Sequence, residues 1–75
     1  MNIYPNPART DFSISFENAL ETISVEVRNM VGQVVLVQQF YDSRIVNLAL
    51  EAPKGMYIVS VKTEGEEYAM KLLKE

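Results

Sequence analysis

Hydrophobic and polar residues alternate with a period of two along most of this chain. Residues 12–16 show the pattern most simply, because Phe12, Ile14 and Phe16 are separated by two serines. Successive side chains of a β-strand point to opposite faces, so this period is typical of a strand with one face on a core and the other in water. The apolar faces predicted in this way comprise Phe12, Ile14, Phe16, Ile23, Val25, Val27, Val46, Leu48, Leu50, Tyr57, Val59 and Val61.

Three segments have a less decisive pattern. Residues 34–37 are all apolar, so the inner face of that strand cannot be assigned. Residues 56–59 are also apolar on both faces, which favours a central position in a sheet. Residues 66–75 consist largely of good helix formers. Their apolar positions nevertheless alternate from Tyr68 to Leu72, and we favour a final strand over a helix.

Turn-forming residues separate these strands. Gly32 can adopt the positive φ that reverses a chain between two strands. Glu64 and Gly65 separate the strand that ends near Thr63 from the final segment, and they predict a tight hairpin with Gly65 in a left-handed position. Residues 42–43 and 51–55 mark two more loops. We therefore expect an all-β fold with one domain over residues 1–75, a small immunoglobulin-like β-sandwich of about seven short antiparallel strands in two sheets.

Two prolines flank an asparagine near the N-terminus, in the sequence Tyr4-Pro5-Asn6-Pro7. Each proline fixes its φ angle and lacks a backbone donor. Asn6 precedes a proline and is therefore restricted to extended conformations. Such a stiff segment cannot pair continuously with a strand, so we expect it to protect a sheet edge.

The composition excludes several classes of function. The chain has no cysteine, histidine or tryptophan, which removes the commonest metal ligands and the commonest general base. Its net charge is −3 and its seven basic residues are scattered, so nucleic-acid binding is not indicated. We expect no enzymatic activity, no cofactor and no metal site. No apolar run is long enough to cross a membrane, and no signal peptide is visible, so we expect any export signal to lie on a longer precursor.

Four motifs in a fixed order resemble a known family. They are YPNP near the start, VRNMVGQVV in the middle, LEAPKGMYIVSVKT after it, and an apolar tail that contains lysines. Over residues 3–74 the sequence resembles the C-terminal sorting domain, type A, of the type IX (Por) secretion system of Bacteroidetes-type Gram-negative bacteria.

The resemblance implies an immunoglobulin-like sandwich at the C-terminus of a larger exported protein, with the cargo preceding this chain. Such a domain directs its precursor from the periplasm to an outer-membrane translocon. A sortase-like cysteine protease then usually cuts the domain off and joins the cargo to a lipopolysaccharide at the cell surface. On this interpretation the chain is a secretion signal without catalysis of its own, and its partners are the translocon and the maturation protease.

The resemblance also selects candidate sorting residues. They match the N-terminal prolines, the mid-domain glycine hairpin, the Gly-x-Tyr strand and the basic final strand of the family, and they are Tyr4, Pro5, Asn6, Pro7, Gly32, Val35, Gly55, Tyr57, Lys71 and Lys74. Several also have a simpler interpretation. Tyr57 fits a core aromatic with a hydrogen-bonded hydroxyl, and the glycines fit turns. The lysines fit either solvated charges or contacts that a terminal edge strand offers to the secretion machinery.

Two further hypotheses follow from the predicted sandwich. The alternative function is an immunoglobulin-like structural or adhesion accessory module of a multidomain surface protein. Exposed strand edges also lead us to expect a homodimer of the isolated chain, formed by edge pairing or by exchange of a terminal strand.

Overall fold

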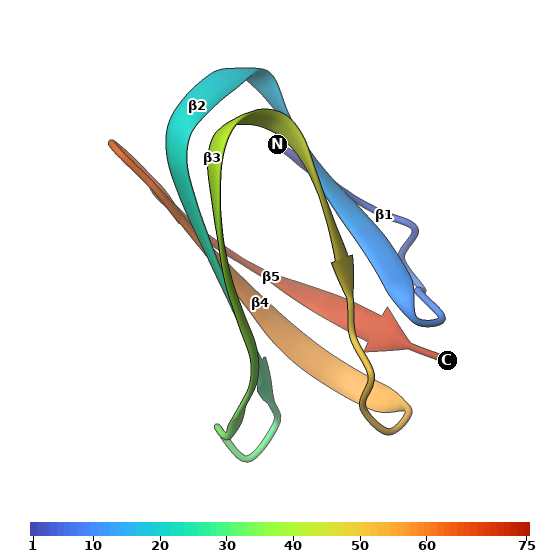
Figure 1. The fold of residues 1–75 in the computed structure, drawn as a ribbon. Helices are drawn as coiled ribbons and strands as arrows, with labels where there is room; N and C mark the ends of the chain where they lie inside the picture. The colour runs from blue at the N-terminus through green and yellow to red at the C-terminus, as the bar shows by residue number, and fades with distance from the viewer.

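Five antiparallel strands form one curled sheet in the computed structural model, which describes residues 1–75 (Figure 1). In chain order the strands are β1 (Asn2–Tyr4), β2 (Asp11–Asn29), β3 (Val34–Ala49), β4 (Gly55–Thr63) and β5 (Glu67–Lys74). Their hydrogen-bonded order is β1-β2-β4-β5, and β3 pairs with the other edge of β2. No helix is present that could span a membrane. The sheet wraps around one core in the manner of a half-barrel.

Strand β2 is the longest element and belongs to both halves of the sheet. Residues 13–15 pair with β1, residues 23–29 pair with β4, and β3 accompanies β2 in both halves. Between Ser15 and Leu20, four residues of β2 lie opposite the single residue Arg44 of β3. Extra residues on one strand bend it and increase its twist. The sheet therefore turns over at this point, and its two halves face the same core (Figure 1).

The prediction of about seven strands in two sheets is wrong, whereas the all-β, antiparallel prediction is confirmed. The alternating segments that contain Phe12 to Phe16 and Ile23 to Val27, two of the short strands predicted from the period of two, are the two halves of β2. The loop predicted at residues 42–43 lies within β3, and the segments on either side of it are the two halves of that strand. Neither strand contains a glycine or proline, so the backbone bends without ending. β3 bends at Asp42, which has a φ of 47°, a conformation that aspartate tolerates better than most residues.

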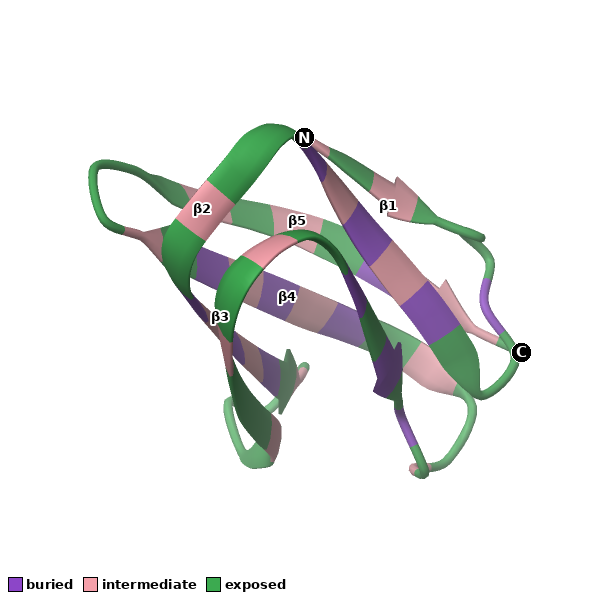
Figure 2. Cartoon of the chain, turned by 45° about the horizontal axis from the view of Figure 1, so that its top comes forward, coloured by how far each residue is buried: buried purple, intermediate pink, exposed green.

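The core is entirely apolar and lies on the inner face of the curled sheet. All fourteen buried residues are hydrophobic, and twelve of them are the residues predicted from the alternation. The other two are Ala8 and Leu72. Figure 2 shows the alternation as successive bands of buried and half-buried residues along β2 and β4. In β5, Tyr68 and Met70 are only half-buried, because this strand lies at an edge of the sheet.

The two predicted hairpins are present. Gly32 has a φ of 90° in the turn between β2 and β3, where a side chain would be strained. The final segment is a strand, as favoured, and it follows a turn closed by a 2.9 Å hydrogen bond from the Thr63 amide to the Glu66 carbonyl. Gly65 in that turn does not have a positive φ. The left-handed conformation predicted for Gly65 is therefore wrong, because the Thr63–Glu66 bond closes the turn without it.

Tyr57 is a core residue, as its simpler interpretation predicted. Its side chain is 4% exposed, and its hydroxyl donates a hydrogen bond to the carbonyl of Pro53 in the loop before β4. The buried phenol thus has a polar partner, and the bond ties this loop to the sheet.

Replacing Leu72 tests how strongly β5 is held by the core. Leu72→Ala is expected to lower the free energy of unfolding by about 2–5 kcal/mol, because removing a fully buried leucine leaves a cavity. Leu73→Ala is the matched control on the opposite face of the same strand and should cost roughly 1 kcal/mol. Urea denaturation followed by circular dichroism measures both values. Equal losses for the two variants would show that the inner face of β5 contributes no more than its outer face.

Candidate functional site

Residues 5–8, here called the proline segment, cover part of the outer edge of β5. The side chain of Asn6 makes two hydrogen bonds to that edge. Its Nδ2 donates to the carbonyl of Lys71 at 3.0 Å, and its Oδ1 accepts from the amide of Leu73 at 3.1 Å. A carboxamide carries a donor and an acceptor, as a peptide group does. Asn6 therefore takes the place that a residue of a neighbouring strand would occupy.

Ala8 continues this contact with its backbone. Its amide donates to the carbonyl of Leu73, and its carbonyl accepts from the amide of Glu75, both at 2.8 Å. These bonds form a parallel bridge with Lys74. Ala8 is only 2% exposed, so its methyl group also joins the core. Asn6 and Ala8 together close the outer edge of β5 over residues 71–75, and this contact is here called the edge clamp.

The prolines bracket the asparagine of the edge clamp. Tyr4 is the last residue of β1 and pairs with Ser13, and both the Tyr4-Pro5 and the Asn6-Pro7 peptide bonds are cis. Neither proline has an amide proton, so neither can extend the pairing of β1 with β2. The chain instead crosses to β5 (Figure 1). The prediction that this segment protects a sheet edge is confirmed, and the edge is that of β5.

Four other candidate residues lie around the edge clamp. Gly55 pairs with Lys74, and Tyr57 pairs with Leu72, across β4 and β5. Lys71 receives the hydrogen bond from Asn6 on its carbonyl. The structure thus brings together eight of the ten candidates, namely Tyr4, Pro5, Asn6, Pro7, Gly55, Tyr57, Lys71 and Lys74.

Gly32 and Val35 lie on a different part of the molecule. Gly32 is in the β2–β3 turn, where its carbonyl accepts a 2.9 Å hydrogen bond from the guanidinium of Arg28. Val35 is the extra residue of a second bulge, opposite the step from Val27 to Arg28, and it is 39% exposed. Because β3 pairs only with β2, these two candidates belong to a hairpin and not to the edge clamp.

The two candidate lysines point to opposite faces of β5. They are three positions apart in a strand whose side chains alternate. Lys71 is exposed on the outer face, opposite Ile58 of β4, whereas Lys74 is half-buried at the end of the strand. The basic residues of the final strand therefore do not form one patch. Lys71 alone presents its charge on the outer face beside the edge clamp.

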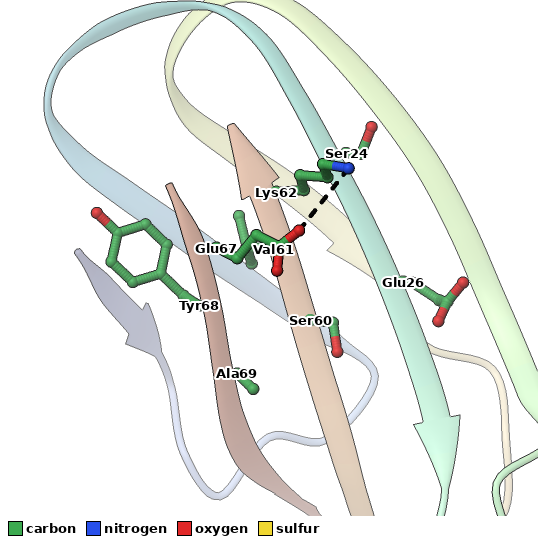
Figure 3. A pocket seen from close by; sticks show the side chains of 8 residues that line it. All are labelled: Ser24, Glu26, Ser60, Val61, Lys62, Glu67, Tyr68 and Ala69. Atoms are coloured by element: carbon green, nitrogen blue, oxygen red, sulfur yellow. Dashed lines mark ion pairs between the residues drawn. The ribbon is translucent and has the colours of Figure 1, made fainter. Parts of the chain in front are cut away.

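A shallow hollow of about 480 Å³ lies beside the other half of β5 (Figure 3). Across it, Lys62 and Glu67 form an ion pair of 3.7 Å, and their side chains are 72% and 75% exposed. Such an exposed pair contributes little to stability. The hollow is lined by Ser24, Glu26, Ser60, Val61, Lys62, Glu67, Tyr68 and Ala69. None of these is a candidate sorting residue, and no group of three metal-ligating side chains is present in the chain.

The pKa of Tyr68 is raised above its ordinary value. The largest cause is the 2.8 Å hydrogen bond that its hydroxyl donates to Glu66 Oε2, which only the protonated phenol can make. Loss of solvent and the negative charges of Glu66 and Glu17 act in the same direction. Tyr68 and Glu66 thus form an acidic, hydrogen-bonded pair at the start of β5.

The edge clamp itself was missed by sequence reasoning. The prolines indicated that some edge is protected, but nothing local indicates that Asn6 contacts residues 65 and 67 positions away. The only sequence sign is an asparagine held between two prolines, where its side chain is free to bond to a distant backbone. Ala8, the second member of the clamp, has no sign at all beyond being apolar in a polar stretch.

Asn6→Ala is expected to open the edge clamp without unfolding the domain. It removes two exposed hydrogen bonds, so the free energy of unfolding should fall by about 1–2 kcal/mol. The amide of Leu73 should exchange with deuterium at least about tenfold faster, as a loss of 1.4 kcal/mol implies. Asn6→Asp should lower the free energy of unfolding further than Asn6→Ala. It keeps the acceptor for the Leu73 amide but turns an anionic oxygen towards the Lys71 carbonyl, and the two oxygens repel each other. Asn2→Ala, an exposed asparagine on β1, is the control and should leave Leu73 unchanged; equal protection in all variants would contradict the clamp.

Tyrosine titration by ultraviolet absorbance tests the pKa of Tyr68. The titration step of Tyr68 is the one that is absent in Tyr68→Phe. Its midpoint should lie above pH ~10, the value for the unfolded chain, and Glu66→Gln should lower this midpoint. Because the folded pKa is raised, this contribution to stability is fully present below the unfolded pKa and is lost as the pH rises through the folded pKa. A Tyr68 midpoint that Glu66→Gln leaves unchanged would show that the hydrogen bond is not the cause.

Comparison with known protein families gives a match over nearly the whole chain. Residues 2–75 match the secretion system C-terminal sorting domain. No curated protein matches the sequence significantly. The family is one of non-catalytic secretion signals, which confirms the expectation that the chain is not an enzyme. The resemblance drawn from the four sequence motifs is confirmed as well. The chain belongs to the family of C-terminal sorting signal domains of the Por (type IX) secretion system.

Proposed function

We propose that this domain directs a larger precursor across the outer membrane through the translocon of the type IX secretion system. In this proposal residues 1–75 form the sorting domain, and the cargo precedes them. A sortase-like protease cuts the domain off at the surface and joins the cargo to a lipopolysaccharide. The precursor is in the periplasm during transit, and its cargo ends at the cell surface or outside the cell. The family match over residues 2–75 is the observation that supports this proposal.

The edge of β5 supports recognition through the last strand. Residues 67–70 pair with β4 and have no strand on their other side. Their outward backbone groups are therefore available to an added strand of the machinery. Residues 71–75 are closed by the edge clamp. A partner strand would begin on the free half of β5 and meet the clamp at Lys71.

The candidate residues near β5 fall into three roles in this proposal. Residues 4–7 set how much of the edge is open, since Asn6 is the group that closes it. Gly55 and Tyr57 hold β4 against the end of β5 through their strand pairs. Lys71, exposed on the outer face, provides a positive charge for an acidic group of the translocon or protease.

The remaining candidates act at a greater distance from this edge. Lys74 is half-buried next to Gly55, so it contacts a partner only at the very end of β5. Gly32 and Val35 shape the β2–β3 hairpin. We therefore propose that these two support the fold and make no contact with the part of the machinery that reads β5.

Export of a fusion protein tests the sorting function. Residues 1–75 are fused to the C-terminus of a fluorescent protein that is exported to the periplasm. Surface and medium fluorescence are compared in a type IX-competent strain and in one that lacks the translocon. We expect export only in the competent strain. Periplasmic retention there would contradict the sorting function and leave the structural-module alternative as the better explanation.

Charge substitutions in the same fusion test the role of the lysines. Deleting residues 71–75 would remove the buried Leu72 and the edge clamp, so it would unfold the domain and would not isolate a contact. Lys71→Gln combined with Lys74→Gln removes only charge, and should lower export about tenfold if one charge-assisted hydrogen bond of about 1.5 kcal/mol is lost. Arg44→Gln with Lys54→Gln removes the same charge from exposed residues outside β5 and the hollow beside it, and should export normally. Equal export of both double variants would show that the charges of Lys71 and Lys74 do not contribute to recognition.

A further inference from the structure

Three strands of the sheet pair on one side only, and they differ in how their free edges are protected. β1 is three residues long and is followed directly by Pro5. β5 is closed by the edge clamp over residues 71–75. β3 is sixteen residues long and pairs with β2 alone, so its outer edge has no neighbour in the structure. The long edge of β3 is the least protected of the three.

Exposed apolar side chains are concentrated on this same strand and on the turn before it. The domain has nine exposed large hydrophobic residues, and seven of them lie between Met30 and Ile45. In β3 they include Val37, which is 66% exposed, and Tyr41, which is 62% exposed. Figure 2 shows long exposed stretches on β3, in contrast to the regular buried bands of β4. A cluster of this kind on one element is typical of an interaction site.

Apart from the bulge at Val35, the first half of β3 also lacks the features that discourage edge pairing. Residues 34–41 contain no charge, proline or glycine, and most of them have high β propensity. Natural edge strands usually carry such residues to prevent the addition of another strand. The first charged residues, Asp42 and Arg44, come after the segment. The bulge at Val35 leaves the following residues in regular pairing with β2.

We propose that residues 34–41 of β3 pair antiparallel with the same segment of a second copy of this chain, across a twofold axis. An uncharged strand is compatible with itself, because no register places like charges opposite one another. Each domain carries a net charge of only −3, so repulsion between copies is small at physiological salt. The two β2–β3 hairpins would join into one four-stranded ribbon with Val37 near its centre.

The size of the contact sets its strength. Eight paired residues extend over roughly 27 Å at about 3.4 Å per residue. A single strand pair of this length buries less than the ~1,000 Å² of a stable interface, so the dimer is a weak one, with a dissociation constant in the range of about 10 μM to 1 mM. The proposal depends on the edge of β3 alone and not on the sorting function.

Sedimentation velocity over a concentration range that spans about 10 μM to 1 mM tests the proposal. The weight-average mass of the sedimenting species should rise from 8.5 kDa, the mass of one chain, towards twice that value as concentration increases. Val37→Lys places a charge at the centre of the pairing strand and should keep the chain monomeric throughout. Because Val37 is 66% exposed, its replacement should leave the circular dichroism spectrum and the unfolding midpoint nearly unchanged.

Val31→Lys is the matched control, since Val31 is 81% exposed in the turn and lies outside the pairing strand. It makes the same change in charge and should associate as the parent chain does. A parent chain that remains monomeric at every concentration would overturn the proposal. So would association that persists in Val37→Lys but disappears in Ala69→Lys, because the contact would then lie on the free half of β5.

Discussion

The continuity of β2 is the constraint on which the rest of the fold depends. β1, β3 and β4 all pair with this one strand, and only β5 is held through another element. A strand that ended near Phe16 would leave two small sheets without a shared backbone. Because β2 continues through a bulge, Phe12 and Val25 belong to the same strand and yet reach the same core from opposite sides. One bent strand replaces the crossover that would otherwise join two sheets.

The edge clamp completes the structure that β2 begins. β5 is the last strand and contacts β4 alone, so its outer side would otherwise expose every second peptide group. Asn6 and Ala8 supply four hydrogen bonds to that side, and Leu72 secures the inner side. The clamp also joins the part of the chain nearest the cargo, in the proposed precursor, to the strand proposed as the recognition element. A change at residues 5–8 would therefore alter the edge proposed for recognition, even if the machinery itself makes no contact with residues 5–8.

The sequence allowed the core to be predicted because a period of two is a local property. Every residue placed on the inner faces of the four alternating segments is buried, from Phe12 to Val61. The number of strands could not be predicted, because a bend without glycine or proline, such as the one at Asp42, looks the same in sequence as the end of a strand. The role of Asn6 could not be predicted from the sequence for another reason. It depends on two backbone groups more than sixty residues away, and no residue pattern near Asn6 specifies them.

The difference between the edges of β3 and β5 has a physical consequence for a domain that must be recognised. A free edge attracts any extended chain, and a closed edge attracts none. On β5 the closed half adjoins a free half only four residues long, so a partner strand gains few hydrogen bonds there unless Asn6 is displaced. Displacing Asn6 exposes the carbonyl of Lys71 and the amide of Leu73 and so lengthens the open edge, while Ala8 still bonds the Leu73 carbonyl and the Glu75 amide. In the proposed recognition, a partner strand on β5 must therefore compete with the chain's own asparagine, whereas the edge of β3 has no such competitor for the second copy proposed to pair with it.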